Sequence, residues 1–249
     1  MNKKKLYEAI FKRKSIRKYK KEKLSEEKIE KIKKFLKDAK ILDKDINYEY
    51  KIVNSDNIKS LLPIKSPHYL QFFSEEKENH LINTGFILQQ LDLYLTVEGL
   101  GSCWFGMAKP KKEIIAKSNY EYIITLVFGK SSEKYVRDSI ENFDRKELSE
   151  IKEGDKYNEL LEAARLSPSA TNGQPWYFKV EEKKIHLYQT ELNFIKKFFY
   201  EKMNGIDMGI ALSHICLAAE HFDYDFTFTK QSTPPAEIEG YNYIGTVSL

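Results

Sequence analysis

Hydrophobic and polar positions follow the same order in the two halves of this 249-residue chain. Each half predicts an amphipathic helix, a short strand, a long helix that is apolar on nearly every face, and a closing strand. The matching segments are 31–41 and 157–167, 50–53 and 178–181, 83–100 and 207–224, and 121–127 and 242–248. Because four elements recur in register, we interpret the pattern as an internal repeat, with chance similarity of amphipathic segments as the alternative.

The two long helices carry a glycine at the same point, Gly85 in the first and Gly209 in the second. A helix that is apolar all round must be buried on most faces, so two units packed through these helices would resemble a homodimer fused into one chain. The charged stretch 149–157 contains few apolar residues that could anchor it to a core. We therefore predict a first half over 1–150 and a second half over 151–249.

The composition is that of a globular protein, because 41% of the residues are hydrophobic and no apolar run is long enough to span a membrane. The first residues enter a run of lysines without the apolar core of a signal peptide, so we expect a cytoplasmic protein. Cys103 and Cys216 both lie in apolar stretches, which favours reduced packing residues over a disulfide.

The net charge of +4 is unevenly distributed along the chain. Residues 1–40 contain 17 Lys or Arg against 6 Asp or Glu, so the rest of the chain is acidic. Most of these lysines are expected to be solvated, and the helix predicted after Ser25 carries its lysines on the outer, polar face. A basic terminus with Tyr7, Phe11 and Tyr19 interleaved could bind nucleic acid, an anionic small molecule, or nothing.

The densest basic motif is KRKSIRKY at 12–19. Arginine forks and a serine hydroxyl at a helix boundary could give a phosphate dianion charge-assisted hydrogen bonds, although a solvated basic face is the alternative. The candidate residues in the motif are Arg13, Lys14, Ser15 and Arg17. Arg145 and Lys146 form a second basic pair after the last strand predicted in the first half. Two converging basic clusters would favour an anion more specifically than either one.

The segment SPSATNGQPW at 167–176 predicts a rigid polar loop. Pro168 ends the preceding helix, Asn172 and Gly173 favour a turn with positive φ, and Pro175 keeps the chain extended into the next strand. Its polar side chains could hydrogen-bond to the edge of a planar heteroaromatic ring, although an ordinary loop is the alternative. These side chains belong to Ser167, Ser169, Thr171, Asn172 and Gln174.

The glycines of GLGSCWFGM at 99–107 do not form a dinucleotide-binding fingerprint, because they follow a helix and the sixth position is Trp104. Gly99 is expected to cap the long helix, and Gly106 leaves room for a flat ring. His214 and His221 would lie about 10.5 Å apart along a helix, too far to share a metal ion. We therefore predict no metal site.

Taken in order, KRKSIRKY, GLGSCWFG, DRKELSEI at 144–151 and SPSATNGQPW resemble the FMN-dependent nitroreductase superfamily over essentially the whole chain. The closer similarity is to the subgroup in which two nitroreductase-like halves are joined in tandem. The resemblance implies a duplicated α+β fold, with mixed sheets of four or five strands and long buried central helices, that forms an internal pseudo-dimer. It also implies that the basic motif of one half and the polar loop of the other contact the same flavin.

Carried over by position, the resemblance assigns roles to individual residues. Contacts to the FMN phosphate and pyrimidine are implied for Arg13, Lys14, Ser15 and Arg17, with Arg145 and Lys146 reaching the phosphate. The segment whose backbone N–H meets flavin N5 is matched by Trp104, Phe105 and Gly106. The loop that covers the other side of the flavin is matched by Ser167, Pro168, Ser169, Asn172 and Gln174.

The implied activity is hydride transfer from NADH or NADPH through FMN to a small organic acceptor such as a nitroaromatic or a quinone, in a ping-pong cycle that needs no essential catalytic acid or base. Because the basic motif occurs only in the first half and the loop only in the second, we predict one FMN per chain, bound by a monomer without a membrane or nucleic-acid partner. A flavin-binding or storage protein without turnover and a nucleic-acid-binding module are the alternative functions.

Overall fold

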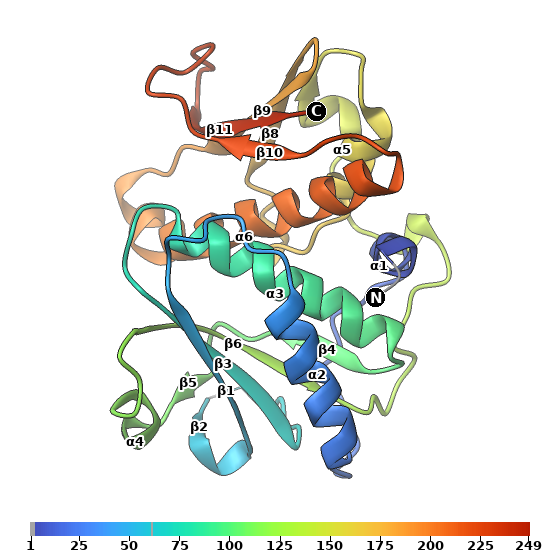
Figure 1. Cartoon of the computed structure of the whole chain (residues 1–249), viewed down its shortest axis with the longest axis vertical. Coiled ribbons are helices and arrows are strands. Elements are labelled where there is room, and N and C mark those ends of the chain that lie inside the picture. The colour runs from blue at the N-terminus through green and yellow to red at the C-terminus, as the bar shows by residue number, and fades with distance from the viewer. Residues whose placement is uncertain (1–2, 61) are drawn as a thin grey trace.

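The computed structural model describes residues 3–60 and 62–249. Two β-sheets lie at opposite ends of the molecule, and two long helices lie side by side between them (Figure 1). These central helices are α3 (His80–Val97) and α6 (Phe194–His221). Both are largely buried, as their nearly continuous apolar sequences predict. α6 begins well before the predicted start at 207.

The first sheet has the strand order β1-β3-β6-β4, and every neighbouring pair is antiparallel. Its strands are β1 (Tyr48–Val53), β3 (His68–Ser74), β4 (Gly101–Trp104) and β6 (Glu121–Gly129). The central strand β3 is buried along its whole length. A separate pair, β2 (Ile58–Lys59) and β5 (Lys109–Pro110), precedes the short helix α4 (Lys112–Ile115).

The second sheet has the order β10-β11-β9-β8-β7 and is mixed, because β7 and β8 run parallel. Its strands are β7 (Lys152–Glu153), β8 (Trp176–Glu181), β9 (Lys184–Thr190), β10 (Thr227–Thr229) and β11 (Tyr241–Ser248). β7 lies inside the stretch 149–157, and the neighbouring Ile151 is only 1% exposed. This stretch is therefore anchored to the core, contrary to our expectation, because a single buried isoleucine and strand pairing suffice. The boundary between residues 150 and 151 stays a prediction.

Three shorter helices complete the fold: α1 (Lys3–Ile10), α2 (Glu26–Asp38) and α5 (Asn158–Arg165). α2 begins where Ser25 Oγ accepts a hydrogen bond from the N–H of Lys28, a common N-cap arrangement. α1 packs against both α3 and α6. Among the helices of the described residues, none combines the length and apolar character that crossing a membrane requires.

The central helices approach closely at two glycines. A Cβ atom at Gly85 would overlap the carbonyl oxygen of Ile206, and a Cβ at Gly209 would overlap that of Ile82. Each glycine thus faces the residue three positions before the other glycine, which is the reciprocity expected of a two-fold relation. One continuous hydrophobic core spans both halves, so the two sheets and the helix layers form a single packed unit.

Candidate functional site

A cavity of about 440 Å³ lies between elements of the two predicted halves. One wall comes from the chain after α1 and from β4 with the turn that follows it; the other comes from the loop after α5 and from α6. The described residues that line it are Ser15, Arg17, Leu62, Ile64, 103–107, Ile124, 168–171, Tyr200, Met203, Ile206, Asp207 and Ile210. The cavity therefore brings together segments about 150 residues apart in sequence.

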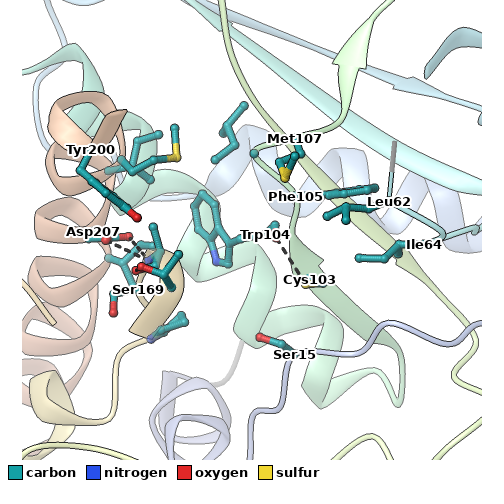
Figure 2. A pocket seen from close by; sticks show the side chains of 18 of the residues that line it. Ser15, Leu62, Ile64, Cys103, Trp104, Phe105, Met107, Ser169, Tyr200 and Asp207 are labelled. Carbon is teal, nitrogen blue, oxygen red and sulfur yellow. Dashed lines mark hydrogen bonds between the residues drawn. The ribbon is translucent and has the colours of Figure 1, made fainter. Parts of the chain in front are cut away.

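The middle of the cavity has flat and apolar walls. In Figure 2, the Trp104 ring lies between Ser169 and Asp207 on one side and Phe105 on the other. Trp104 Nε1 donates a hydrogen bond to Gln89 Oε1 at 3.3 Å, which fixes the ring. A Cβ at Gly106 would lie 3.3 Å from Met203 Sδ, across the cavity. An aromatic ring and apolar side chains favour a planar ligand here.

Arg13 does not line the cavity but holds a residue that does. Its side chain is 2% exposed and forms an ion pair from Nε to Asp92 Oδ2 at 2.5 Å. Its Nη2 donates to Ser15 Oγ at 3.0 Å, and Ser102 Oγ donates to the other oxygen of Asp92. The sequence analysis did not predict a role for Asp92, although a single carboxylate inside an apolar helix is a recognisable signal.

Arg13 is one of three arginines that lie close together. Burial and the positive charge of Arg13 lower the pKa of Arg137 to about 10. Burial, followed by the charges of Arg13 and Arg137, lowers the pKa of Arg145 to about 10. The guanidinium carbons of Arg137 and Arg145 lie 4.2 and 5.8 Å from the centre of the Phe143 ring. Positive charge is therefore concentrated at one place, and sequence reasoning did not identify Arg137.

Each of these guanidinium groups keeps one terminal nitrogen without a protein partner within the described residues. The nitrogens are Nη1 of Arg13 and Nη2 of Arg137 and Arg145. None of these three nitrogens is among the fully buried polar atoms of the described residues that lack a partner, so they stay accessible to a ligand. A group with several anionic oxygens, such as a phosphate, meets the requirement of this arginine cluster.

The arginine cluster is tied to the polar loop of the second half. Arg145 donates from Nε to the carbonyl oxygen of Ser167 at 3.0 Å and from Nη1 to Asn172 Oδ1 at 2.5 Å. The N–H of Lys146 donates to Gln174 Oε1 at 2.8 Å. The structure thus joins the second basic pair, Arg145 and Lys146, to the polar loop.

The predicted site residues fall into two groups in the structure. Those on the cavity wall are Ser15, Arg17, Trp104, Phe105, Gly106, Pro168 and Ser169. Those away from the wall are Arg13, Lys14, Arg145, Lys146, Ser167, Asn172 and Gln174. Lys14 Nζ donates instead to the carbonyl oxygen of Lys134 at 3.3 Å, and the fully buried Ser167 Oγ has no partner in the described part of the chain.

The loop that carries Pro168 and Ser169 adopts an unusual backbone. Positive φ angles occur at Thr171, Asn172 and Gln174, with values of 52°, 59° and 48°. Gly173 instead has a φ of −67°, so the predicted positive-φ turn is right for Asn172 and wrong for Gly173. A β-branched threonine at positive φ is strained, and the hydrogen bonds from Arg145 and Lys146 to this loop help to hold it in place.

Asp207 is a cavity residue that the sequence analysis missed. Its side chain is 4% exposed, and both carboxyl oxygens accept the N–H of Ala170, at 3.2 and 3.0 Å. Burial raises the pKa of Asp207 to about 8, while the hydrogen bond from Ala170 acts in the opposite direction. An aspartate at the polar entry of an apolar helix looks like an ordinary cap in sequence, so only the fold reveals its position.

A second cavity, of about 380 Å³, also lies between elements of the two predicted halves. The described residues that line it are Leu42, Asp43, Lys44, Asp45, Asn79, Phe228, Thr229 and Lys230. None of them is an arginine, and Lys230 pairs with Glu78 at 2.7 Å. The basic residues on this wall are Lys44 and Lys230, whereas Arg17 lies on the wall of the first cavity and the arginine cluster lies beside it.

Other candidate chemistry receives no support from the described residues. They contain no group of His, Cys, Asp and Glu that could hold a metal ion. His214 lies buried between Gln89 Nε2 and the carbonyl oxygen of Ala163, as predicted for a packing residue. Cys103 and Cys216 are both buried, and neither forms a disulfide within the described residues, also as predicted.

The aromatic residues of the basic terminus are engaged within the chain. Tyr7 stacks on His221 with ring centres 4.1 Å apart and also meets Phe11 edge to face. The hydroxyl of Tyr19 donates to the carbonyl oxygen of Ile16 at 2.5 Å. A nucleic-acid module would need such rings exposed for stacking on bases.

Comparison with known proteins shows to which family this chain belongs. The model of the family described as "Putative TM nitroreductase" matches residues 5–219, and the chain belongs to that family. A "putative nitroreductase" structure from Thermotoga maritima is similar to it, with a TM-score of 0.66, 24% identity, and coverage of 97% of this chain and 91% of that one. The resemblance to the nitroreductase fold is thus confirmed.

Smaller nitroreductases match only part of the chain. A nitroreductase family protein from Clostridium difficile 630 has a TM-score of 0.48 and 22% identity, over 61% of this chain and 97% of its own. A nitroreductase in complex with FMN from Exiguobacterium sibiricum, also described as putative, has a TM-score of 0.44 and 15% identity, over 62% and 98%. No curated protein matches this chain.

Proposed function

We propose that this protein is an FMN-dependent oxidoreductase that uses NADH or NADPH to reduce a small organic acceptor. The observation that carries the proposal is the arginine cluster of Arg13, Arg137 and Arg145, placed next to a flat-walled cavity and tied to the polar loop on its other side. Membership of a nitroreductase family supports the same reaction class. When bound, FMN would accept a hydride from the nicotinamide and deliver it to the acceptor.

The arginine cluster would hold the phosphate of FMN. Arg137 and Arg145 have free terminal nitrogens among the described residues, and Arg13 orients Ser15 toward the cavity. The guanidinium geometry suits a phosphate dianion better than lysine would, because each planar fork can donate two parallel hydrogen bonds. A phosphate would supply the acceptor oxygens that the cluster lacks.

The cavity would hold the flavin ring system and, on its open side, the nicotinamide or the acceptor in turn. Trp104 and Phe105 provide flat apolar surface, and Gly106 leaves the backbone accessible there. The described residues include no dinucleotide-binding loop, which fits a nicotinamide that stacks on the ring and leaves before the acceptor enters. Such alternation would give a ping-pong cycle.

The test is a flavin titration followed by reduction. FMN added to flavin-free protein should quench the fluorescence of Trp104, and substitution of Trp104 by Phe should remove most of that signal while the buried Trp176 remains. NADH or NADPH should then bleach the bound flavin without oxygen, and a quinone or nitroaromatic should restore its colour. Initial-rate plots at several acceptor concentrations should be parallel.

Two outcomes would change the proposal. If FMN binds but neither nucleotide reduces it faster than free FMN, the protein is a flavin-binding or storage protein. If FMN leaves the tryptophan fluorescence unchanged and the protein stays colourless, the cofactor assignment is wrong.

A further inference from the structure

We propose that Asp207 is a proton donor in this cavity, giving its proton to the oxygen of a planar carbonyl acceptor such as a quinone or an enone. The inference rests on the proposed function above. Asp207 lines the cavity beside Ser169, on the side opposite Phe105, and is 4% exposed (Figure 2). Its carboxyl group therefore borders the space where an acceptor would lie while being shielded from bulk water.

The surroundings of Asp207 favour a carboxylic acid over a carboxylate. Within the described residues its recorded hydrogen-bond partner is the N–H of Ala170, and no cation is paired with it. A buried carboxylate without a cation is costly, and burial accordingly raises its pKa to about 8. The other titratable groups on the cavity wall are Arg17, Cys103 and Tyr200. At neutral pH one oxygen can accept from Ala170 while the other carries the proton.

The matching position in the first half carries an amide side chain instead of a carboxyl group. Asn83 lies two residues before Gly85, as Asp207 lies two residues before Gly209. Asn83 Oδ1 accepts the N–H groups of Leu42 and Asp43 at 3.1 and 3.2 Å, and so anchors the equivalent loop with an amide. Loop anchoring alone therefore requires no ionisable group, and the carboxyl occurs on the side that has the arginine cluster.

Reduction of the acceptor consumes a proton, which the carboxyl group of Asp207 would supply. A quinone that receives a hydride, with its two electrons, becomes a hydroquinone monoanion, and an enone that receives it at the β-carbon becomes an enolate; in both, the negative charge lies on oxygen. The Oδ–H bond of Asp207 breaks as a new O–H bond forms on that oxygen, and the product leaves as a neutral hydroquinone or enol. The Asp207 carboxylate then recovers its proton from water. One hydride and one proton complete the two-electron reduction.

Asp207→Asn tests this role, because the Asn83 arrangement shows that an amide can anchor such a loop. FMN affinity and the rate of flavin reduction by NADH should change less than about threefold, whereas kcat/KM for a quinone should fall about 100-fold at neutral pH, the low end for a positioned general acid. The wild-type value should decline above about pH 8, and the variant should lose this dependence. Asp207→Glu should restore part of the rate.

A second measurement is independent of turnover. Infrared spectra of flavin-free wild-type protein should contain a carboxylic acid C=O band at about pH 6 that disappears at about pH 10, and this titrating band should be absent from Asp207→Asn. Glu220→Gln, which removes a carboxylate from the same helix outside the cavity, is the matched control and should change neither the band nor the pH profile.

The outcomes separate the two proposals. A wild-type rate and pH profile in Asp207→Asn, or a spectrum in which Asp207 is already ionised at about pH 6, would overturn the role of Asp207 while leaving the proposed function intact. If the wild-type protein takes up no FMN, both the proposed function and the role of Asp207 are wrong.

Discussion

Arg145 Nη1 donates a hydrogen bond to Asn172 Oδ1 at 2.5 Å, and this contact joins the basic cluster of the first half to the polar loop of the second. The two residues are 27 positions apart in sequence. Arg145 also donates to the carbonyl oxygen of Ser167, so one side chain holds the loop at two points. Pro168 and Ser169 lie on the same loop and line the cavity, so this link lies beside the cavity wall.

Arg145→Ala should weaken FMN binding by about 10- to 150-fold, since a charge-assisted hydrogen bond is worth about 1.5–3 kcal/mol. Riboflavin lacks the phosphate, so its affinity should fall much less. Isothermal titration with both flavins measures the difference. Arg165→Ala is the control, because Arg165 is already paired with Glu162 at 2.5 Å. Equal losses for FMN and riboflavin would rule out a phosphate contact.

Arg13→Ala should lower stability as well as weaken FMN binding. Arg13 is 2% exposed and Asp92 is fully buried, so removal of the arginine leaves a buried carboxylate without its partner. Breaking such a pair costs about 3–5 kcal/mol. Urea denaturation of flavin-free protein should show this loss, and Asp92→Asn in the Arg13→Ala background should recover part of it. An unchanged urea midpoint would show that the ion pair is dispensable.

Gly85→Ala and Gly209→Ala should each destabilise the protein by about 3 kcal/mol or more, because the added methyl group meets helix backbone that cannot move independently. Gly205→Ala on the same helix is the control. Its Cβ would meet side-chain atoms of Leu81 and no backbone atom, and alanine favours the helix, so less stability should be lost than at Gly85 or Gly209. Thermal melts of the three variants compare them, and similar melting temperatures for all three would contradict the close approach.

Asp207 should make stability depend on pH. In the folded chain its pKa is about 8, whereas in the unfolded chain it is near 3.8. The folded state therefore holds a proton that the unfolded state has lost, and stability falls as pH rises from about 4 to about 8. Asp207→Asn lacks this effect. The free energy of unfolding of the variant, relative to that of the wild type, should therefore increase through that range by about 1.4 kcal/mol for each unit of pKa difference and then level off. Urea denaturation midpoints of the wild type and of Asp207→Asn, measured at several pH values, test this prediction. If both midpoints change with pH in parallel, the prediction is wrong.

The order of elements could be predicted from the sequence because burial leaves a periodic pattern. The segments at 121–127 and 242–248 are strands, and Gly99, with φ of 74°, ends α3 as expected. Strand β3 was not predicted, since a strand buried on both faces has no alternation. The first sheet is antiparallel throughout, which local patterns do not specify.

The candidate site was predictable only in part. The motifs around Ser15 and Ser169 could be paired through their family resemblance, and both serines line the cavity. The ion pair that buries Arg13, the third arginine at Arg137 and the carboxyl of Asp207 depend on long-range packing. No local spacing links residues 13 and 92, or 170 and 207, so these contacts emerge only from the folded chain.

The two halves should together build a single flavin site, because the second cavity has no arginine on its wall. The most direct test is a titration of flavin-free protein with FMN, combined with a molar-mass measurement in solution. We predict one FMN for each 249-residue chain, bound by a monomer, with Asn172→Ala and Arg145→Ala weakening the same site. Two FMN per chain, or binding that appears only in a dimer, would contradict it.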